Sequence, residues 1–250
     1  MSMEYDPILY EADQRAFLKE EVEFYKNICA KFDSKNILEL GVGTGRIFSK
    51  LLPMVNYAAG LDISKSMLDV CNKRCKPNTH YRLYKKNFVK FNLNMTFDLI
   101  YIPFNTFQHI LLEEGQISCL ESIRMHMHKN SRFILDLMNL ENLTFDFDNW
   151  KQDYSSLLAD GKIIEREQKT INIDKKTSIV SKVFLYKEII NGSIEKTHEF
   201  NAFMKITPNE KMKKLLIESG FEIEDVWSDY LFGHDSNTKK MIYCLKRYEF

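Results

Sequence analysis

The stretch Glu39-Leu40-Gly41-Val42-Gly43-Thr44-Gly45 decides the fold of this 250-residue chain. It follows a short apolar run, residues 36–40, that predicts a buried β-strand, and it precedes apolar residues at helical spacing over residues 46–52. Glycines between a strand and a helix permit positive φ angles and let the backbone approach a ligand without a Cβ in the way. The free N–H groups of the following helix add a positive dipole end. The stretch therefore predicts a ligand-binding turn of an α/β sheet.

Two carboxylates separate this turn from other glycine-rich loops. The spacing is G-x-G-x-G, whereas dinucleotide sites use G-x-G-x-x-G, and no Lys-Ser/Thr pair follows as a P-loop requires. Glu39 directly precedes the turn, where its carboxylate would oppose a pyrophosphate but suit a cationic amino-acid ligand. Asp62 ends the next predicted strand about 20 residues on, where a carboxylate can accept both hydroxyls of a ribose. Together they indicate a ligand with a ribose and a cationic end.

Strands alternate with helices from the N-terminal region to about residue 140. The predicted strands are residues 36–40, 57–61, 80–83, 97–102 and 132–137, and the predicted helices are residues 11–32, 46–52, 64–73 and 108–128. Such alternation is typical of a parallel, doubly wound sheet. The pattern changes after residue 150. Extended stretches at 162–173, 178–190 and 194–206, the last two joined by Asn191-Gly192, predict an inserted antiparallel meander. A helix to Ser219 and strands at 222–227 and 239–246 then return the chain to the main sheet.

The segment from Glu39 to Gly45, with Gly60-Leu61-Asp62, resembles motif I and the acidic second strand of class I methyltransferases dependent on S-adenosylmethionine (SAM). The resemblance continues through residues 97–110 and 132–137 to the closing strands after Gly220-Phe221, and covers nearly the whole chain. It implies a Rossmann-like, doubly wound, seven-stranded sheet whose last strand is antiparallel, with SAM as the cofactor. It also implies that Gly41, Gly43 and Gly45 line the methionine end of SAM and that Asp62 holds its ribose.

The same resemblance assigns further cofactor contacts. Ile63 would meet the adenine ring, and Asn87-Phe88 occupies the position of an acidic-hydrophobic pair, with Asn in place of the commoner Asp. Pro103 and Asn105 would place a backbone turn beside the sulfonium. Phe104 and Phe107, in the same segment, are equally well explained by core packing.

The N-terminal segment and the meander are similar to those of small-molecule methyltransferases, including the sugar and glycine N-methyltransferase branch. Within that branch an aromatic residue near the N-terminus closes over the cofactor, which points to Tyr10 and then Tyr5; anchoring of the terminus is the alternative. Methyl transfer is an in-line displacement, so alignment does most of the work and a general base is optional. His109, after the fourth predicted strand, is the candidate base for an N or O nucleophile, against a purely structural role. His198, His234 and Asp136 are weaker candidates.

The resemblance divides the chain into three predicted parts. Residues 1–34 form an N-terminal helical lid, residues 35–150 and 207–250 form the SAM-binding domain, and residues 151–206 form an inserted subdomain that caps the substrate or contacts a second copy. An exposed edge of the meander makes a homodimer conceivable.

Composition limits the partners. Lys plus Arg and Asp plus Glu number 35 each, so the overall charge gives no reason to expect nucleic acid. The five cysteines lack the paired spacing of a zinc site, so we expect no metal and reduced thiols in a cytoplasmic protein. No apolar run approaches the ~20 residues of a membrane span, and the acidic, aromatic first ten residues do not resemble a signal peptide.

Three other functions stay open from the sequence. The chain could be a catalytically silent SAM-binding or partner-binding module, because an intact loop does not establish turnover. A nicotinamide-dependent oxidoreductase is disfavoured by the loop spacing and by Glu39. A nucleic-acid methyltransferase is disfavoured by the neutral charge and because residues 102–105 read Ile-Pro-Phe-Asn, not Asn/Asp-Pro-Pro-Tyr/Phe.

Overall fold

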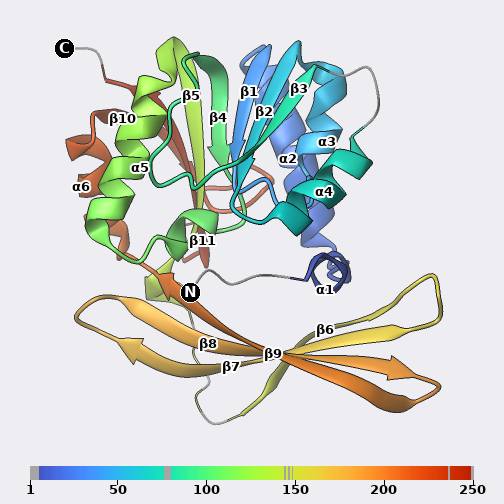
Figure 1. The fold of residues 1–250 in the computed structure, drawn as a ribbon. Coiled ribbons are helices and arrows are strands. Elements are labelled where there is room, and N and C mark those ends of the chain that lie inside the picture. Colours follow the sequence, from blue (N-terminus) through green and yellow to red (C-terminus); the bar gives the residue numbers. More distant parts are fainter. Residues whose placement is uncertain are drawn as a thin grey trace.

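The chain forms two separate β-sheets with a short N-terminal segment between them (Figure 1). The computed structural model describes residues 6–75, 80–143, 145, 147, 149–235 and 237–248, so Tyr5 lies outside the described residues. The larger sheet has seven strands in the order β10-β11-β5-β4-β1-β2-β3, and the smaller has four in the order β6-β7-β8-β9. No helix among the described residues is both long and apolar enough to cross a membrane.

The seven-stranded sheet is parallel except for one strand. Its strands are β1 (Asn36–Leu40), β2 (Tyr57–Asp62), β3 (Tyr81–Lys85), β4 (Phe97–Ile102), β5 (Met127–Met138), β10 (Phe221–Trp227) and β11 (Lys240–Arg247). The central strand β1 pairs in parallel with β2 and β4, whereas β11 runs antiparallel to both β5 and β10. The predicted Rossmann-like sheet with an antiparallel last strand is therefore confirmed. Because β1 is covered on both faces, it reads as a nearly continuous apolar run.

Helices cover both faces of this sheet (Figure 1). They are α2 (Phe17–Lys31), α3 (Phe48–Leu51) and α4 (Lys65–Arg74) on one face, with α5 (Glu113–Met125) and α6 (Asn209–Glu218) on the other. Successive side chains of a strand point to opposite faces. Accordingly, Ile37 joins the buried cluster of α2, and Leu38 joins that of α5. Ser64 caps α4 by accepting a hydrogen bond from the backbone N–H of Met67, as predicted.

The four-stranded sheet is an antiparallel meander below the carboxyl edge of the main sheet (Figure 1). Its strands are β6 (Lys151–Leu157), β7 (Ile163–Asp174), β8 (Ile179–Ile190) and β9 (Ser193–Lys205). Asn191 and Gly192 both have positive φ, 51° and 79°, as the predicted two-residue hairpin turn requires. Strand β6 was not predicted, because its sequence KQDYSSL carries only two large apolar residues and no regular alternation.

Three predicted helices are shorter in the structure. The helix predicted over 11–32 is limited to α2, and a separate short helix, α1 (Pro7–Glu11), precedes it. Between α1 and α2, Asp13 accepts hydrogen bonds from both the backbone and the guanidinium of Arg15. The helix predicted over 108–128 is a 3₁₀ turn, η2 (Thr106–His109), followed by α5. The chain leaves the helical conformation at His126, the C-cap of α5, and His128 belongs to β5. The helix predicted over 46–52 is limited to α3, and Pro53 lies in a following 3₁₀ turn, η1 (Leu52–Met54).

Candidate active site

The glycine turn after β1 is fastened to the end of the neighbouring strand β2. Gly41, Gly43 and Gly45 have positive φ angles of 75°, 53° and 76°. The backbone N–H of Gly41 donates to the carbonyl of Leu61 at 2.8 Å, and the N–H of Gly43 donates to Oδ2 of Asp62 at 2.8 Å. The second carboxylate oxygen of Asp62 accepts from the N–H of Ser64 at 2.8 Å. The two predicted elements of the cofactor site, the turn and Asp62, are thus joined directly.

The three glycines of the turn face different surroundings. A Cβ added at Gly41 would overlap the methyl group of Thr106, and one added at Gly45 would lie 2.5 Å from Sγ of Cys71. A Cβ at Gly43 would meet no heavy atom closer than the carbonyl oxygen of Gly41, at 4.0 Å. Gly41 and Gly45 are therefore needed by the fold itself, whereas Gly43 faces open space where a ligand can approach the backbone.

Replacing Gly43 by alanine is expected to weaken SAM binding at least tenfold, about 1.4 kcal/mol, because the new methyl group occupies that open space. The left-handed backbone adds a strain of ~1–2 kcal/mol to the folded state. Gly192→Ala is the matched control, since Gly192 also has a positive φ with nothing within 4 Å, in the distant hairpin. Calorimetric titration and thermal unfolding separate the two effects. Equal SAM affinity in the two variants would show that Gly43 does not face the cofactor.

Glu39, at the end of β1, is a buried carboxylate beside the turn. It is 2% exposed, and its Oε2 accepts a hydrogen bond from the hydroxyl of Tyr101 at 2.8 Å. Burial raises the pKa of Glu39 to about 8, although the Tyr101 hydrogen bond and the charge of Arg46 act in the opposite direction. A carboxylate in this position gains from a cationic ligand, which would favour its ionised form.

Two small hollows meet beneath the turn. One, of about 20 Å³, lies between Glu39, Gly41 and Pro103; the other, of about 50 Å³, lies between Asp13 and Arg166. Both are also lined by the same three residues, Tyr10, Arg46 and Phe104. They therefore form one crevice that runs from the carboxyl edge of the main sheet to the inner face of the second sheet.

Helix α1 covers this crevice. Glu11, its last residue, accepts hydrogen bonds from the hydroxyl of Thr44 in the glycine turn and from the guanidinium of Arg74 in α4. On its other side, Leu9 and Ala12 are buried against the second sheet. Ligand pockets for molecules of cofactor size usually exceed ~300 Å³, so α1 or the side chains that it holds must move before such a molecule can enter.

Several residues predicted for the cofactor site lie together. Tyr10, Glu39, Gly41 and Pro103 line the same hollow. Asn105 follows Pro103 and Phe104 with a left-handed backbone, φ 61°, and its side-chain oxygen is buried with no hydrogen-bond partner in the described part of the chain.

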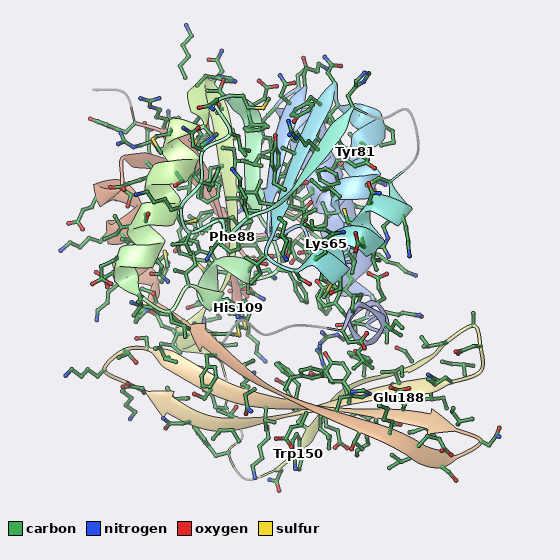
Figure 2. The ribbon with its side chains drawn as sticks, viewed as in Figure 1. Lys65, Tyr81, Phe88, His109, Trp150 and Glu188 are labelled. Atoms are coloured by element: carbon green, nitrogen blue, oxygen red, sulfur yellow. The ribbon has the colours of Figure 1, made fainter. Side chains whose placement is uncertain are left out.

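Other predicted residues lie outside the two hollows. Ile63 is exposed next to Asp62, the side-chain oxygen of Asn87 accepts the N–H of Val89 at 2.9 Å, and Phe88 packs against the main core. Their adenine contacts stay predictions. His109 lies under the main sheet and faces the second sheet (Figure 2), with its Nδ1 3.2 Å from the carbonyl oxygen of Phe203.

The two weaker histidine candidates are paired with acids. Nε2 of His198 lies 2.7 Å from Oε1 of Glu188, and Nε2 of His234 lies 3.0 Å from Oδ1 of Asp225. Neither histidine lines the crevice. The geometry therefore does not favour His198 or His234 as a group that contacts the ligand.

Arg46 is a site residue that the sequence reasoning missed. Its guanidinium pairs with the buried carboxylate of Glu21 at 2.5 Å and lies over the ring of Phe104, 5.4 Å from the ring centre. A signal was available, because Arg46 directly follows Gly45 and precedes α3, and a cation near a helix N-terminus is opposed by the helix dipole. A costly cation in a ligand-binding turn indicates an anionic partner.

Comparison with known proteins agrees with this geometry. Residues 37–130 match the model of a family described as a methyltransferase domain. By this match, residues 37–130 are similar to a methyltransferase domain. The match includes the glycine turn, Glu39 and Asp62, and ends before the second sheet. The comparison with curated proteins returns no match to this chain.

Solved structures of SAM-dependent methyltransferases share the fold of the whole chain. One from Clostridium acetobutylicum superposes with a TM-score of 0.78 at 19% identity, covering 96% of this chain and 95% of its own. A sugar N-methyltransferase from Streptoalloteichus has a TM-score of 0.78 at 14% identity, covering 100% and 95%. A SAM-bound amino pentose methyltransferase from Micromonospora echinaspora has a TM-score of 0.76 at 14% identity, covering 99% of both chains. The predicted resemblance to SAM-dependent methyltransferases is thereby confirmed at the level of the fold.

The residues of the methyltransferase domain fit SAM chemically. SAM carries a ribose, a cationic ammonium and sulfonium, and a carboxylate. Asp62 offers its two oxygens at the edge of the turn, Glu39 offers a buried carboxylate, and Arg46 offers a guanidinium. Gly43 faces open space in the same turn, and the side-chain oxygen of Asn105 is a buried acceptor without a hydrogen-bond partner among the described residues.

Proposed function

We propose that the protein transfers the methyl group of SAM to a small-molecule acceptor, preferentially to an amine nitrogen. The observation that carries the proposal is the pair of carboxylates, Glu39 and Asp62, at the ends of adjacent strands on either side of the glycine turn. A diphosphate would be repelled by such a pair, whereas a cationic adenosyl ligand is attracted to it.

Each polar group of the turn has a distinct task in this proposal. Asp62 accepts the ribose hydroxyls, Glu39 pairs with the ammonium group, and Arg46 pairs with the carboxylate. SAM supplies a methyl group already activated by its positive sulfur. The protein orients the acceptor in line with it and excludes water, and orientation of this kind can contribute ~7–11 kcal/mol to catalysis.

The acceptor is expected in the larger hollow, between the turn and the second sheet. Glu11 and Asp13 contribute carboxylates to its lining, Phe104 contributes an aromatic ring, and Arg46 and Arg166 contribute guanidinium groups. Carboxylates and aromatic faces both favour cationic amines. Two of the structural neighbours are described as acting on a sugar nitrogen and on an amino pentose, which supports the same acceptor class.

His109 stays a candidate base for this reaction. With Nδ1–H donating to the carbonyl of Phe203, the neutral ring would leave Nε2 as an acceptor for a proton. An amine acceptor needs only to lose its proton before the transfer, so His109→Ala should lower the rate by far less than the loss of Asp62 or Arg46.

Tyr10→Ala is expected to weaken SAM binding about tenfold while lowering the unfolding temperature by only a few degrees. The ring lies between both hollows, and an aromatic face beside a sulfonium contributes ~0.5–2 kcal/mol. Tyr10→Phe is the matched control, because it keeps the ring and removes only the hydroxyl, which adjoins Arg46. Titration of both variants with SAM checks this. Unchanged SAM affinity in the alanine variant would show that Tyr10 only anchors the N-terminal segment.

The proposal is tested by methyl transfer itself. The purified protein is incubated with SAM carrying a labelled methyl group and a panel of small amino compounds, including amino sugars, each matched with its hydroxyl analogue. Label is expected in amines and not in their hydroxyl counterparts. Transfer to hydroxyl compounds alone would contradict the amine preference.

A silent SAM-binding module is the second candidate function, and the close cover of the crevice by α1 favours it. Under that alternative SAM binds but no member of the panel receives a methyl group. A cytoplasmic location and a homodimer remain predictions of the sequence.

A further inference from the structure

A buried cluster of polar side chains lies behind the crevice, on the side of the C-terminal strands. It joins Glu21 of α2, Asp136 of β5, Tyr230 after β10, and Lys240 of β11. The hydroxyl oxygen of Tyr230 is 3.0 Å from Oε1 of Glu21 and 2.6 Å from Oδ2 of Asp136, and Nζ of Lys240 is 2.9 Å from it. Nζ of Lys240 also donates to Oδ1 of Asp136 at 2.7 Å. Both carboxylates are 0% exposed.

The hydroxyl of Tyr230 connects the two acids of the cluster. It lies within hydrogen-bond distance of one oxygen of each, and its shorter contact, 2.6 Å, is to Asp136. The ammonium group of Lys240 lies 2.9 Å from the same hydroxyl oxygen, and its positive charge offsets the repulsion between the two carboxylates. Burial raises the pKa of Glu21, and the negative charge of Asp136 adds to the effect while Arg46 opposes it.

The cluster holds two residues that line both hollows of the crevice. Oε2 of Glu21 lies 2.5 Å from the guanidinium of Arg46. Oδ2 of Asp136 accepts the backbone N–H of Phe104 at 3.2 Å. Phe104 has a left-handed backbone with φ 55°, a conformation that a bulky residue keeps only when its surroundings hold it there. Tyr230 is the link between these two supports.

We propose that Tyr230 is a positioning residue for SAM, which through Glu21 and Asp136 fixes the guanidinium of Arg46 and the Phe104 turn against the crevice. The proposal rests on the proposed function, because it takes SAM as the ligand. Tyr230 lies about 100 residues beyond the part of the chain that matches the methyltransferase domain family, so Tyr230 and Lys240 complete the cofactor site from the C-terminal part of the chain.

The position of Arg46 has an electrostatic consequence. Its guanidinium lies 2.5 Å from Oε2 of Glu21, and Arg46 lines both hollows. There it attracts an anionic group in the crevice, such as the carboxylate of the amino-acid end of SAM. If the cluster were only a structural bridge, its loss would lower stability and weaken all ligands alike.

The test compares two ligands by calorimetric titration: SAM, and 5′-methylthioadenosine, which lacks the amino-acid end. Tyr230→Phe is expected to bind SAM about tenfold more weakly than the wild type and 5′-methylthioadenosine within about twofold. Tyr243→Phe is the matched control, since Tyr243 is equally buried and loses a hydrogen bond to Asn209 near α6, away from the crevice. It should bind both ligands as the wild type does.

Glu21→Gln provides a second variant that does not depend on the behaviour of Tyr230→Phe. Glutamine keeps the shape of the side chain but removes the charge that pairs with Arg46, so the variant is expected to bind SAM about tenfold more weakly than the wild type and 5′-methylthioadenosine within about twofold.

Three outcomes overturn the inference. One is SAM affinity in Tyr230→Phe equal to that of the wild type, another is an equal loss for both ligands, and the third is SAM affinity in Glu21→Gln equal to that of the wild type. A wild type that binds neither ligand would instead overturn the proposed function, and this inference with it.

Discussion

Asp62→Ala is expected to weaken SAM binding at least 100-fold, about 2.7 kcal/mol. Hydrogen bonds to a charged group contribute ~1.5–3 kcal/mol each, and the variant loses two such bonds to the ribose. It also removes the acceptor that holds the N–H of Gly43 at 2.8 Å, so the glycine turn loses its fastening to β2. Asp62→Asn should bind SAM with an affinity between those of the wild type and Asp62→Ala, because the amide keeps one acceptor oxygen but no charge.

Asp98→Ala is the matched control for this prediction. Asp98 also uses its carboxylate to accept backbone N–H groups, from Lys35 at 2.8 Å and from Asn36 at 2.7 Å, but at the opposite edge of the sheet. Its loss should lower the unfolding temperature and leave SAM affinity unchanged. Calorimetric titration of both variants gives the comparison. Affinities that fall equally in Asp62→Ala and Asp98→Ala would mean that Asp62 acts through stability alone.

Titration of Glu39 alone is expected to lower the free energy of unfolding of the ligand-free protein as the pH rises from 5 to 8. The expected decrease is about 1.4 kcal/mol for each pH unit. The unfolded carboxyl group ionises near its ordinary value of 4.5, whereas in the folded protein burial raises the pKa of Glu39 to about 8. Between these values the folded state holds a proton that the unfolded state has released. The stabilising contribution is therefore complete below pH 4.5, declines as the pH rises, and is lost above pH 8.

Urea unfolding at pH 5.5, 6.5 and 7.5 measures this slope. Glu39→Gln should have a flatter dependence on pH than the wild type, because glutamine does not titrate. Glu195→Gln, in the exposed hairpin of the second sheet, should keep the slope of the wild type. A slope that survives in Glu39→Gln would assign the dependence to another group.

The fold could be predicted from the sequence where local signals are strong. The apolar run of β1, the glycine turn and the Asn191-Gly192 hairpin each depend on residues close together in the chain. Prediction was wrong at the start of the helix expected over 11–32. There Asp13 and Arg15 form an ion pair between α1 and α2, and the apolar spacing used to predict the helix does not reveal it.

The candidate site shows the same division. The turn and Asp62 were predicted because the motif is contiguous and the next strand follows at a fixed interval. The support of Arg46 was missed, because Glu21 and Tyr230 are separated by 209 residues and neither has a local signal of function. Asp136 was only a weak candidate, and the structure shows it accepting the N–H of Phe104.

The most direct test of the central claim is calorimetric titration of the wild-type protein with SAM and, in parallel, with NADH. The carboxylates on both sides of the glycine turn predict saturable binding of SAM at one site per chain and no binding of NADH. Absence of SAM binding, or binding of NADH in its place, would contradict the account.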